Sequence, residues 1–409
     1  MHERAATYHK SACKTRVDVI QEDRARYRGE GLHVAIEATG VKYGGGAHVL
    51  LRVLGELLED RRVGRVTVFA SADPDRRWRN PDLDRVVIVE PPMVESPGWR
   101  VLWLEAGLAN YCGQIKPDVV LCFNGVGYVG EEIAQVNLLQ QPLLFKPRVL
   151  GKMPWAFRAR MEVIRRLSQA SCRRADRVIV QTPTVAALAS SLFGLSLSTM
   201  RIYLPDIRWS EPARISDSVR GLRDVREDRR VLYVGSTIEY KRIDVAVKTV
   251  GRLRHTYEGL TLFATIPEDH EYAKLDWVYA LGALSEGEVR ACMELATLLV
   301  MPSLAETVGL PMVEAMSVGC PILASNLAYV HDVCEDAALC FLPGSVRSCM
   351  ARMEHLLKDP ILRHTYAGRG KIRAEKISKA EPYRMMVDEL CQVALPESQK
   401  RERKDGSVA

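Results

Sequence analysis

Residues 298–325 read LLVMPSLAETVGLPMVEAMSVGCPILAS and contain two glutamates, Glu306 and Glu314, with seven residues between them. The apolar run 298–301 predicts a buried strand, and the polar residues after it predict a loop. Pro311 suits the first turn of a following helix, where its missing N–H costs little. A loop facing the free N–H groups of a helix binds phosphate. With a carboxylate on each side of such a corner, the stretch indicates a nucleotide-sugar site.

Each glutamate also has a simpler explanation. An acid near a helix N-terminus, such as Glu306, can merely compensate the helix dipole. Glu314 is harder to explain this way, because its helix is otherwise full of core-facing side chains and an unpaired buried carboxylate is costly. We therefore expect Glu314 to have a polar partner, and ribose hydroxyls fit that role.

Short apolar strands alternate with helical patterns from His33 onward, which indicates parallel sheets covered on both faces. Helices are expected over 99–115, 153–173, 183–192 and much of 345–395. The predicted strands fall into two sets: 33–38, 66–71, 86–90, 119–124, 136–140, 178–182 and 201–205, then 231–236, 260–265, 278–283, 298–303, 321–325 and 339–343. The fold class is therefore α/β, with two Rossmann-like, doubly wound domains facing across a cleft.

The length of 409 residues favours two domains over one core. The segment 210–230 is charged and poor in large apolar groups, so it is interpreted as an interdomain linker. The expected division is a polar N-terminal extension (1–30), an acceptor-side domain (31–209), the linker (210–230), a nucleotide-sugar-binding domain (231–380), and a C-terminal helix with a polar tail (381–409).

Cysteine usage and hydropathy exclude several classes of protein. The 10 cysteines show no paired CxxC spacing, so they are interpreted as reduced thiols and a zinc site is not expected. No apolar run is long enough to span a bilayer, and the first residues lack a signal-peptide core. We expect a cytoplasmic protein.

Two further segments suggest phosphate binding. Gly44, Gly45 and Gly46 follow the first strand and precede a helix, where glycines let backbone N–H groups approach an anion. A tight turn explains them equally well. Gly235 and Ser236 occupy the matching place in the second half.

Lys241 and Arg242 follow that second loop closely. Such cations can neutralise a diphosphate leaving group without a metal ion. The alternative is a pair of exposed basic residues that begin a helix.

Together these motifs carry a resemblance. The segment from Val231 to Pro343 resembles the donor-binding half of retaining GT-B glycosyltransferases of the GT4 group. ETVGLPMVE matches their E-x7-E pattern, and AMSVGCPILAS and DAALCFLP continue the match. VLYVGSTIEYKR resembles the family's phosphate loop and lysine segment, and YGGGAH resembles its N-terminal glycine loop.

The resemblance implies roles for individual residues. Glu306 would contact the transferred sugar and, with Lys241, form the catalytic pair, while Glu314 would bind the ribose. No cofactor and no metal is implied beyond the nucleoside-diphosphate sugar itself. The other donor-binding positions would be Gly44, Gly45, Gly46, Gly235, Ser236, Arg242, Ala283, Leu284, Thr307, Val308, Gly309 and Leu310.

Two departures from the family concern its cations and its histidine. Ser236 and Thr237 stand where an arginine often follows the phosphate-loop glycine. Many members carry a histidine near the reacting carbon, whereas the corresponding strand ends here offer the amides Asn124, Gln140 and Gln141 as acceptor-side candidates. Amides bind hydroxyls but do not shuttle protons. A retaining front-face transfer can instead let the leaving phosphate take the acceptor's proton.

Residues 146–174 hold nine Lys or Arg and one acid. On a helical wheel Arg158, Arg165 and Arg166 share one side, Arg160 lies in the apolar arc and would have to snorkel, and Trp155 borders the helix. The opposite side carries Phe157, Met161, Ile164 and Leu167. This pattern fits a peripheral contact with anionic lipid. An ordinary domain helix is the alternative, and nucleic acid binding is disfavoured because no aromatic platform is interleaved.

The sequence thus predicts a retaining, metal-independent glycosyltransferase that moves a sugar to a saccharide or lipid-linked acceptor in polysaccharide or glycolipid synthesis. Two alternatives stay open. A GT-B sugar-nucleotide epimerase shares the architecture. A non-catalytic nucleotide-sugar-binding subunit would explain why the histidine is missing.

Overall fold

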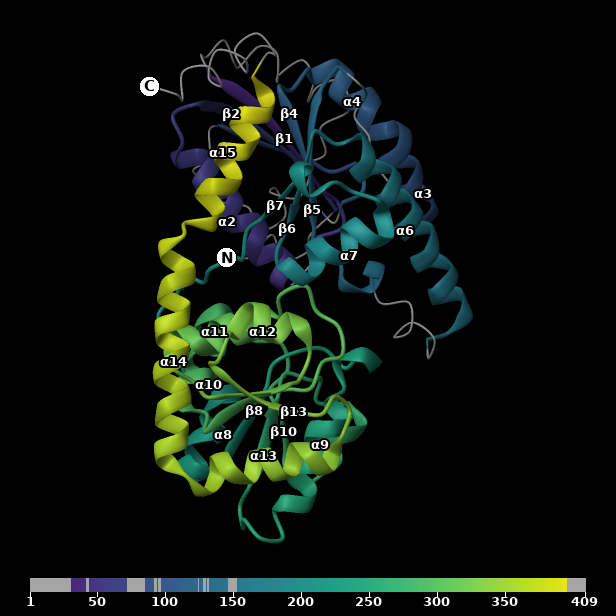
Figure 1. The fold of residues 1–409 in the computed structure, drawn as a ribbon. Coiled ribbons are helices and arrows are strands. Elements are labelled where there is room, and N and C mark those ends of the chain that lie inside the picture. Colours follow the sequence, from purple (N-terminus) through teal and green to yellow (C-terminus); the bar gives the residue numbers. More distant parts are fainter. Residues whose placement is uncertain are drawn as a thin grey trace, which may run out of the picture.

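The computed structural model describes residues 31–41, 44–71, 85–91, 94, 97–123, 125–127, 130, 132–145 and 153–395. These residues form two α/β domains, one above the other in Figure 1. The segments 1–30 and 396–409, residues 146–152 and the acceptor-side candidate Asn124 lie outside the described residues.

The first domain is built on a seven-stranded sheet in the order β3-β2-β1-β4-β5-β6-β7. All its pairings are parallel, as the buried apolar runs predict. The strands are β1 (Leu32–Ala38), β2 (Val63–Ala70), β3 (Val86–Val89), β4 (Val119–Phe123), β5 (Ala134–Leu139), β6 (Arg177–Val180) and β7 (Met200–Ile202).

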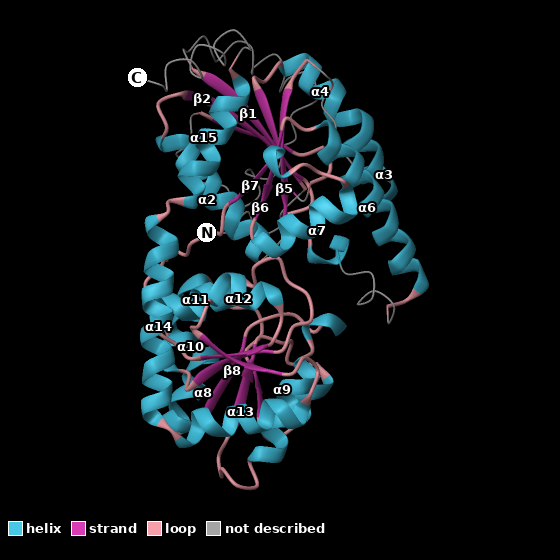
Figure 2. Ribbon diagram, in the orientation of Figure 1, coloured by secondary structure: helices cyan, strands magenta, loops and turns pink. Residues whose placement is uncertain are grey.

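Helices cover both faces of this sheet (Figure 2). The helix expected over 99–115 is interrupted by one turn of π-helix. The helical elements are α2 (Gly45–Glu59), α3 (Pro97–Leu102), the π-turn η1 (Trp103–Gly107), α4 (Leu108–Ile115), the 3₁₀ turn η2 (Pro142–Phe145), α6 (Trp155–Arg174), α7 (Pro183–Phe193) and the 3₁₀ turn η3 (Leu197–Thr199).

The second domain repeats the design with six parallel strands in the order β10-β9-β8-β11-β12-β13. Its strands are β8 (Arg230–Tyr233), β9 (Thr261–Ala264), β10 (Val278–Ala280), β11 (Leu298–Met301), β12 (Ile322–Ser325) and β13 (Ala338–Phe341). Its α-helices are α8 (Asp217–Asp224), α9 (Ile243–Leu253), α10 (Glu286–Leu295), α11 (Leu310–Val318), α12 (Ala328–Cys334), α13 (Val346–Lys358) and α14 (Pro360–Lys379), and its short turns are η4 (Glu227–Arg229), η5 (Glu239–Lys241) and η6 (Glu271–Lys274).

The segment 210–230, expected as a solvated linker, contains helix α8. Val219 and Leu222 of this helix are fully buried in the core of the second domain. Two apolar residues three positions apart are enough to bury one face of so short a helix, but they are too few to stand out in a charged sequence. The part of this segment that forms α8 therefore packs into the core of the second domain.

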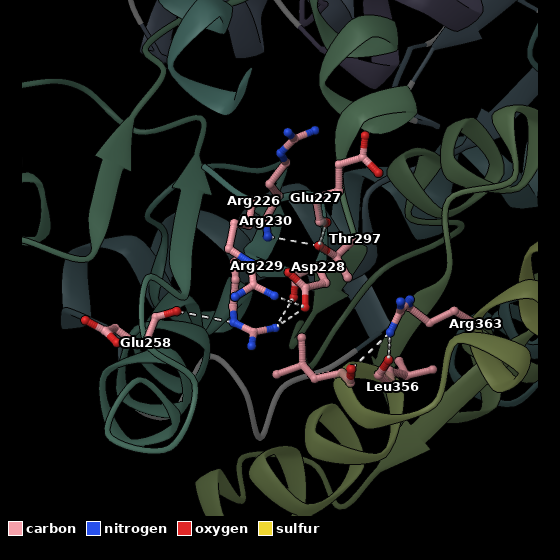
Figure 3. A network of polar contacts seen from close by, with 10 residues as sticks. Arg226, Glu227, Asp228, Arg229, Arg230, Glu258, Thr297, Leu356 and Arg363 are labelled. Atoms are coloured by element: carbon pink, nitrogen blue, oxygen red, sulfur yellow. Dashed lines mark hydrogen bonds and ion pairs between the residues drawn. The ribbon is translucent and has the colours of Figure 1, made fainter. Parts of the chain in front are cut away.

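A polar network follows α8 at the amino-terminal ends of the strands of the second sheet (Figure 3). The Arg230 backbone N–H donates to Thr297 Oγ1 at 2.9 Å, which ties the start of β8 to the start of β11. Arg229 is paired with Asp228 at 2.6 Å and donates to the Glu258 carbonyl at 3.3 Å. These contacts lie at the end of the strands opposite to the predicted site.

The last helix, α15 (Pro382–Ala394), returns to the first domain. Helix α14 runs along the second domain, and α15 continues upward beside α2 (Figure 1). Tyr383, Met386 and Leu390 are buried in the core of the first domain. Glu389 is paired there with Arg177 and Arg201, each at 2.8 Å. The chain therefore crosses between the domains twice.

Candidate active site

The loop between β11 and α11 adopts the predicted strand–loop–helix corner. Gly309 precedes α11 with φ +73°, a left-handed conformation that disfavours side chains. A Cβ at this position would lie 3.1 Å from the terminal methyl groups of Met301 and Met312. Proline stands in the first turn of α11, as expected. Glycine at 309 is thus favoured by the backbone conformation, and the packing there is tight.

Glu306, on this loop, is held by an ion pair. Its Oε1 accepts from Lys241 Nζ at 2.6 Å and from Ser303 Oγ at 2.6 Å, and the Glu306 side chain is only 8% exposed. Burial alone would lower the pKa of Lys241, but the charge of Glu306, the neighbouring Tyr240 and the hydrogen bond to Glu306 together outweigh burial, and the pKa is raised. The predicted catalytic pair is therefore in direct contact, and Lys241 is a cation.

The other predicted phosphate ligands of the second domain have protein partners. The Arg242 guanidinium binds both oxygens of Asp244, at 2.7 and 3.0 Å. The Gly235 N–H donates to Thr265 Oγ1 at 2.9 Å, whereas Ser236 is exposed. Lys241 is thus the cation placed beside Glu306, and Arg242 has its charge balanced locally.

Two helix N-termini meet at the boundary between the domains. A Cβ on Gly45, the first residue of α2, would lie 2.8 Å from Leu310 Cδ1, on the first residue of α11. Neither helix has an acid in its first turn, and Gly44 gives α2 no side-chain cap. The positive ends of two helix dipoles therefore lie together with no acid in either first turn, and Glu306, on the loop before α11, is already paired with Lys241. This arrangement favours an anion.

Glu314 lies half-buried in α11. Burial raises the pKa of its carboxyl to about 7, and the nearby Glu286 adds to the shift. Among the described residues, no hydrogen bond or ion pair to this carboxylate is found, whereas Glu286 accepts from the Ser210 backbone N–H at 2.7 Å. Glu314 thus lacks the polar partner that its position demands.

His48, in the first turns of α2, was missed as a candidate because only the strand ends were considered for a histidine. Burial lowers the pKa of its ring against the opposing effect of Glu286, so the imidazole is neutral near pH 7. Its Nε2 is buried and has no hydrogen-bond partner among the described residues. The signal was present in YGGGAH, where this histidine stands two residues after the last glycine.

Thr307 points toward the first domain. Its hydroxyl donates to Gln181 Oε1 at 2.9 Å, and the Gln140 carbonyl is an alternative acceptor 3.4 Å from the same oxygen. Its carbonyl accepts from Thr182 Oγ1 at 3.1 Å. The sequence assigned this residue to the donor, but its side chain joins the two domains.

The other residues predicted from the sequence differ in their burial and contacts. The Nε2 of Gln140 is buried without a partner among the described residues, while Gln141 Oε1 accepts from the Leu143 N–H at 3.5 Å. Val308 is buried in the second core. Gly46 is half-buried beside Val41, and Ala283 and Leu284 follow β10, with Ala283 exposed.

A small pocket adjoins Glu306 and has walls from both domains. It encloses about 320 Å³ including its open mouth. The first domain contributes Phe145, Thr184 and Leu188 among others, and α12 with the residue before it contributes Leu327, Ala328 and Tyr329. Within the described part of the chain, no group of three or more His, Cys, Asp or Glu side chains is placed to hold a metal ion.

Comparisons with known proteins agree with this geometry. Residues 228–359 match the family described as Glycosyl transferases group 1. This group 1 segment contains both glutamates and Lys241. O-antigen chain mannosyltransferase B of Escherichia coli is 32% identical over 102 residues, 25% of this chain and 27% of that protein. Glycogen synthase of Mycobacterium tuberculosis is 25% identical over 202 residues, 46% of this chain and 47% of that protein. The chain thus matches less than half the length of either relative.

Solved structures extend the likeness of the fold beyond the group 1 segment. WaaG, a glycosyltransferase involved in lipopolysaccharide biosynthesis, superposes with a TM-score of 0.68 over 88% of this chain and 99% of that chain, at 16% identity. HepE of Anabaena, in complex with UDP and glucose, gives 0.66 over 88% and 98%, at 14% identity. At such identities the likeness establishes the fold, which is the predicted GT-B architecture.

The ion pair at Glu306 leads to a first prediction. Replacing Lys241 by Met leaves a buried carboxylate without its cation, so the free energy of unfolding should fall by about 3 kcal/mol. The double variant Lys241→Met/Glu306→Gln should recover most of this loss, as measured by urea unfolding. Lys358→Met, which breaks an exposed pair with Glu354, is the control and should change little. Equal losses in the single and double variants would contradict the pairing.

Glu314 leads to a second prediction, on pH. The unfolded chain ionises this carboxyl near 4.5 and the folded protein near 7, so ionisation destabilises the fold as pH rises through that window. Glu314→Gln should therefore be more stable than the wild type at pH 8, by up to about 3 kcal/mol, and equal to it below pH 4.5. Urea unfolding at both pH values measures the difference. The exposed Glu294→Gln should show no such trend, and a matching trend would argue against the assignment.

Proposed function

We propose that this protein is a retaining glycosyltransferase of the GT4 type that transfers a sugar from a nucleoside diphosphate to a saccharide or lipid-linked acceptor. The observation that supports this most is the meeting of the α2 and α11 N-termini next to the pair Lys241–Glu306. The two helix ends and the lysine would hold the diphosphate, and Glu306 would contact the sugar.

In the donor site the two glutamates would bind different parts of the donor. The Glu314 carboxylate has no partner of its own, so it would accept hydrogen bonds from ribose hydroxyls, and ligand binding would compensate its burial. The neutral ring of His48 lies on the same side, near Glu286, and would be a further hydrogen-bonding group there. Glu306 keeps a protein cation and would act on the sugar instead.

The transfer would proceed on one face of the sugar. The bond between the anomeric carbon and the phosphate oxygen breaks, the bond to the acceptor oxygen forms, and the acceptor's proton passes to the leaving phosphate. No protein base is then required, which suits an acceptor side with the amide of Gln140. Lys241 and the two helix dipoles would stabilise the charge on the leaving diphosphate without a metal.

Donor binding and turnover test this proposal. In a thermal-shift screen of UDP-, GDP-, ADP- and TDP-sugars, one should raise the melting temperature clearly, and less so in Glu314→Ala. With that donor, an acceptor panel and EDTA, Glu306→Gln should lower turnover by at least about a hundredfold, while the exposed Glu294→Gln stays near wild type. The anomeric configuration of the product, read by NMR, should match the donor.

The other outcomes separate the rivals. Conversion of the donor sugar without any acceptor would identify an epimerase. Binding without turnover across the panel would favour a non-catalytic subunit. The absence of any responding donor would contradict the proposal as a whole.

We further propose that helix α6 contacts an anionic membrane at the cytoplasmic face. Trp155 is 80% exposed, and Arg158 and Arg160 are exposed, so Arg160 does not have to snorkel as the sequence suggested. Arg165 and Arg166 are both paired with Glu162, which reduces the free charge of the helix. Among the described residues, no helix is both long and apolar enough to cross a bilayer.

Vesicle binding tests this contact. The protein should sediment with phosphatidylglycerol vesicles more strongly than with phosphatidylcholine vesicles. Arg158→Gln/Arg160→Gln should weaken the former by roughly thirtyfold, because each cation near an anionic surface contributes about 1 kcal/mol. Arg220→Gln/Arg223→Gln on α8 is the control. Equal binding to both lipids would identify α6 as an ordinary domain helix.

A further inference from the structure

The corner between β6 and α7 contacts the loop that carries Glu306. Thr182 and Gln181 lie in this corner, in the first domain, and both are almost completely buried. Thr182 Oγ1 donates to the Thr307 carbonyl, and the Thr307 hydroxyl donates to Gln181 Oε1. Thr307 directly follows Glu306 in the chain, so the first domain holds the peptide next to that glutamate.

A third contact extends the same junction. The Thr184 backbone N–H, in the first turn of α7, donates to Asp332 Oδ2 at 2.8 Å. Asp332 belongs to α12 of the second domain and lies at the positive end of the α7 dipole, where an acid is favourable. The pocket beside Glu306 has Thr184 in its wall. The contact between Thr184 and Asp332 thus lies at the edge of the pocket beside Glu306.

We propose that Gln181 is a positioning residue: by accepting the Thr307 hydroxyl across the domain boundary, it holds Glu306 in its reactive place when the domains are closed. Within the second domain, Glu306 is oriented by Lys241 and Ser303, both through one carboxylate oxygen. Those contacts fix the side chain, whereas Gln181 and Thr182 fix the backbone that carries it.

The chemistry of Gln181 suits this task. A neutral amide oxygen accepts a hydroxyl hydrogen in a buried interface without bringing a charge near the Glu306–Lys241 pair. When the domains separate, Thr307 and Gln181 are both hydrated, so the interaction exists only in the closed arrangement. Loss of this acceptor would leave the buried hydroxyl with only the Gln140 carbonyl, 3.4 Å away, which disfavours the closed state.

Hydrogen exchange on the full chain tests the positioning without reference to activity. Gln181→Met keeps the length of the side chain and removes the acceptor. Amides of the peptide covering 302–312 should exchange roughly fivefold faster or more in this variant. Gln169→Met is the matched control, because Gln169 binds the Leu192 carbonyl within the first domain. Asp332→Asn should act in the same direction as Gln181→Met.

Kinetics with the donor found by screening form the second arm, which rests on the proposed function. Gln181→Met should lower kcat roughly tenfold or more with little change in donor KM, and its effect should not add to that of Thr307→Val. Thr307→Ser, which keeps the hydroxyl, should lower kcat less than Thr307→Val does.

The two arms separate the possible failures. Unchanged exchange at 302–312 in Gln181→Met, or exchange equal to that of Gln169→Met, would overturn the positioning role. A fall in kcat without faster exchange would also overturn it, since Gln181 would then act on substrate directly. Faster exchange in a protein with no turnover would support the contact and refute the proposed transfer.

Discussion

The arrangement of this molecule depends on keeping the carboxylate of Glu306 charged and nearly buried at the junction of two domains. Little of this carboxylate is exposed to water, and the protein supplies Lys241 at 2.6 Å and the hydroxyl of Ser303 instead. The order of the sheet makes this possible. β8 and β11 are neighbours, so the segments that follow their carboxyl ends bring residues 241 and 306 together although they are 65 positions apart.

The two glutamates of the motif differ in their electrostatic environment. Glu306 has a cation and a hydroxyl donor, whereas burial and Glu286 raise the pKa of Glu314 to about 7. A compensated charge can remain ionised in the free protein, and an uncompensated one favours a ligand that brings hydrogen-bond donors. The acid-free N-termini of α2 and α11 lie between the domains as a site for negative charge. The groups suited to bind an anion and those suited to bind hydroxyls therefore lie at the same boundary between the two domains.

The connections between the domains lie on two sides of this boundary. On one side the chain crosses twice, through the segment before α8 and through the junction of α14 and α15, where Glu381 adopts a left-handed conformation. On the other side hydrogen bonds from Gln181, Thr182 and Thr184 reach the second domain. Covalent crossings persist in any arrangement of the domains, whereas the hydrogen bonds require contact. A hinge opposite a set of polar contacts is suited to opening and closing.

Much of this protein is determined by the sequence alone. Runs of Val, Ile and Leu predict the parallel strands, because strands buried on both faces carry mostly apolar side chains. Gly309 and Pro311 predict the corner between β11 and α11, because glycine adopts its left-handed backbone without strain and proline suits a first helical turn. Ser285 and Glu288 form a capping box at the start of α10, which is likewise a local sequence signature. All of these depend on local conformation or on the pattern of burial.

The tertiary structure decided which partner each polar group takes. Arg242 could be expected at a phosphate but is bound to Asp244, and Thr307 could be expected at the donor but bonds Gln181. Helix α8 is too short to predict, and it exists because Val219 and Leu222 find a core to enter. His48 is an unremarkable helix residue until the second domain brings Glu286 near it. Contacts between residues far apart in the chain depend on how two domains meet, and no local pattern encodes that distance.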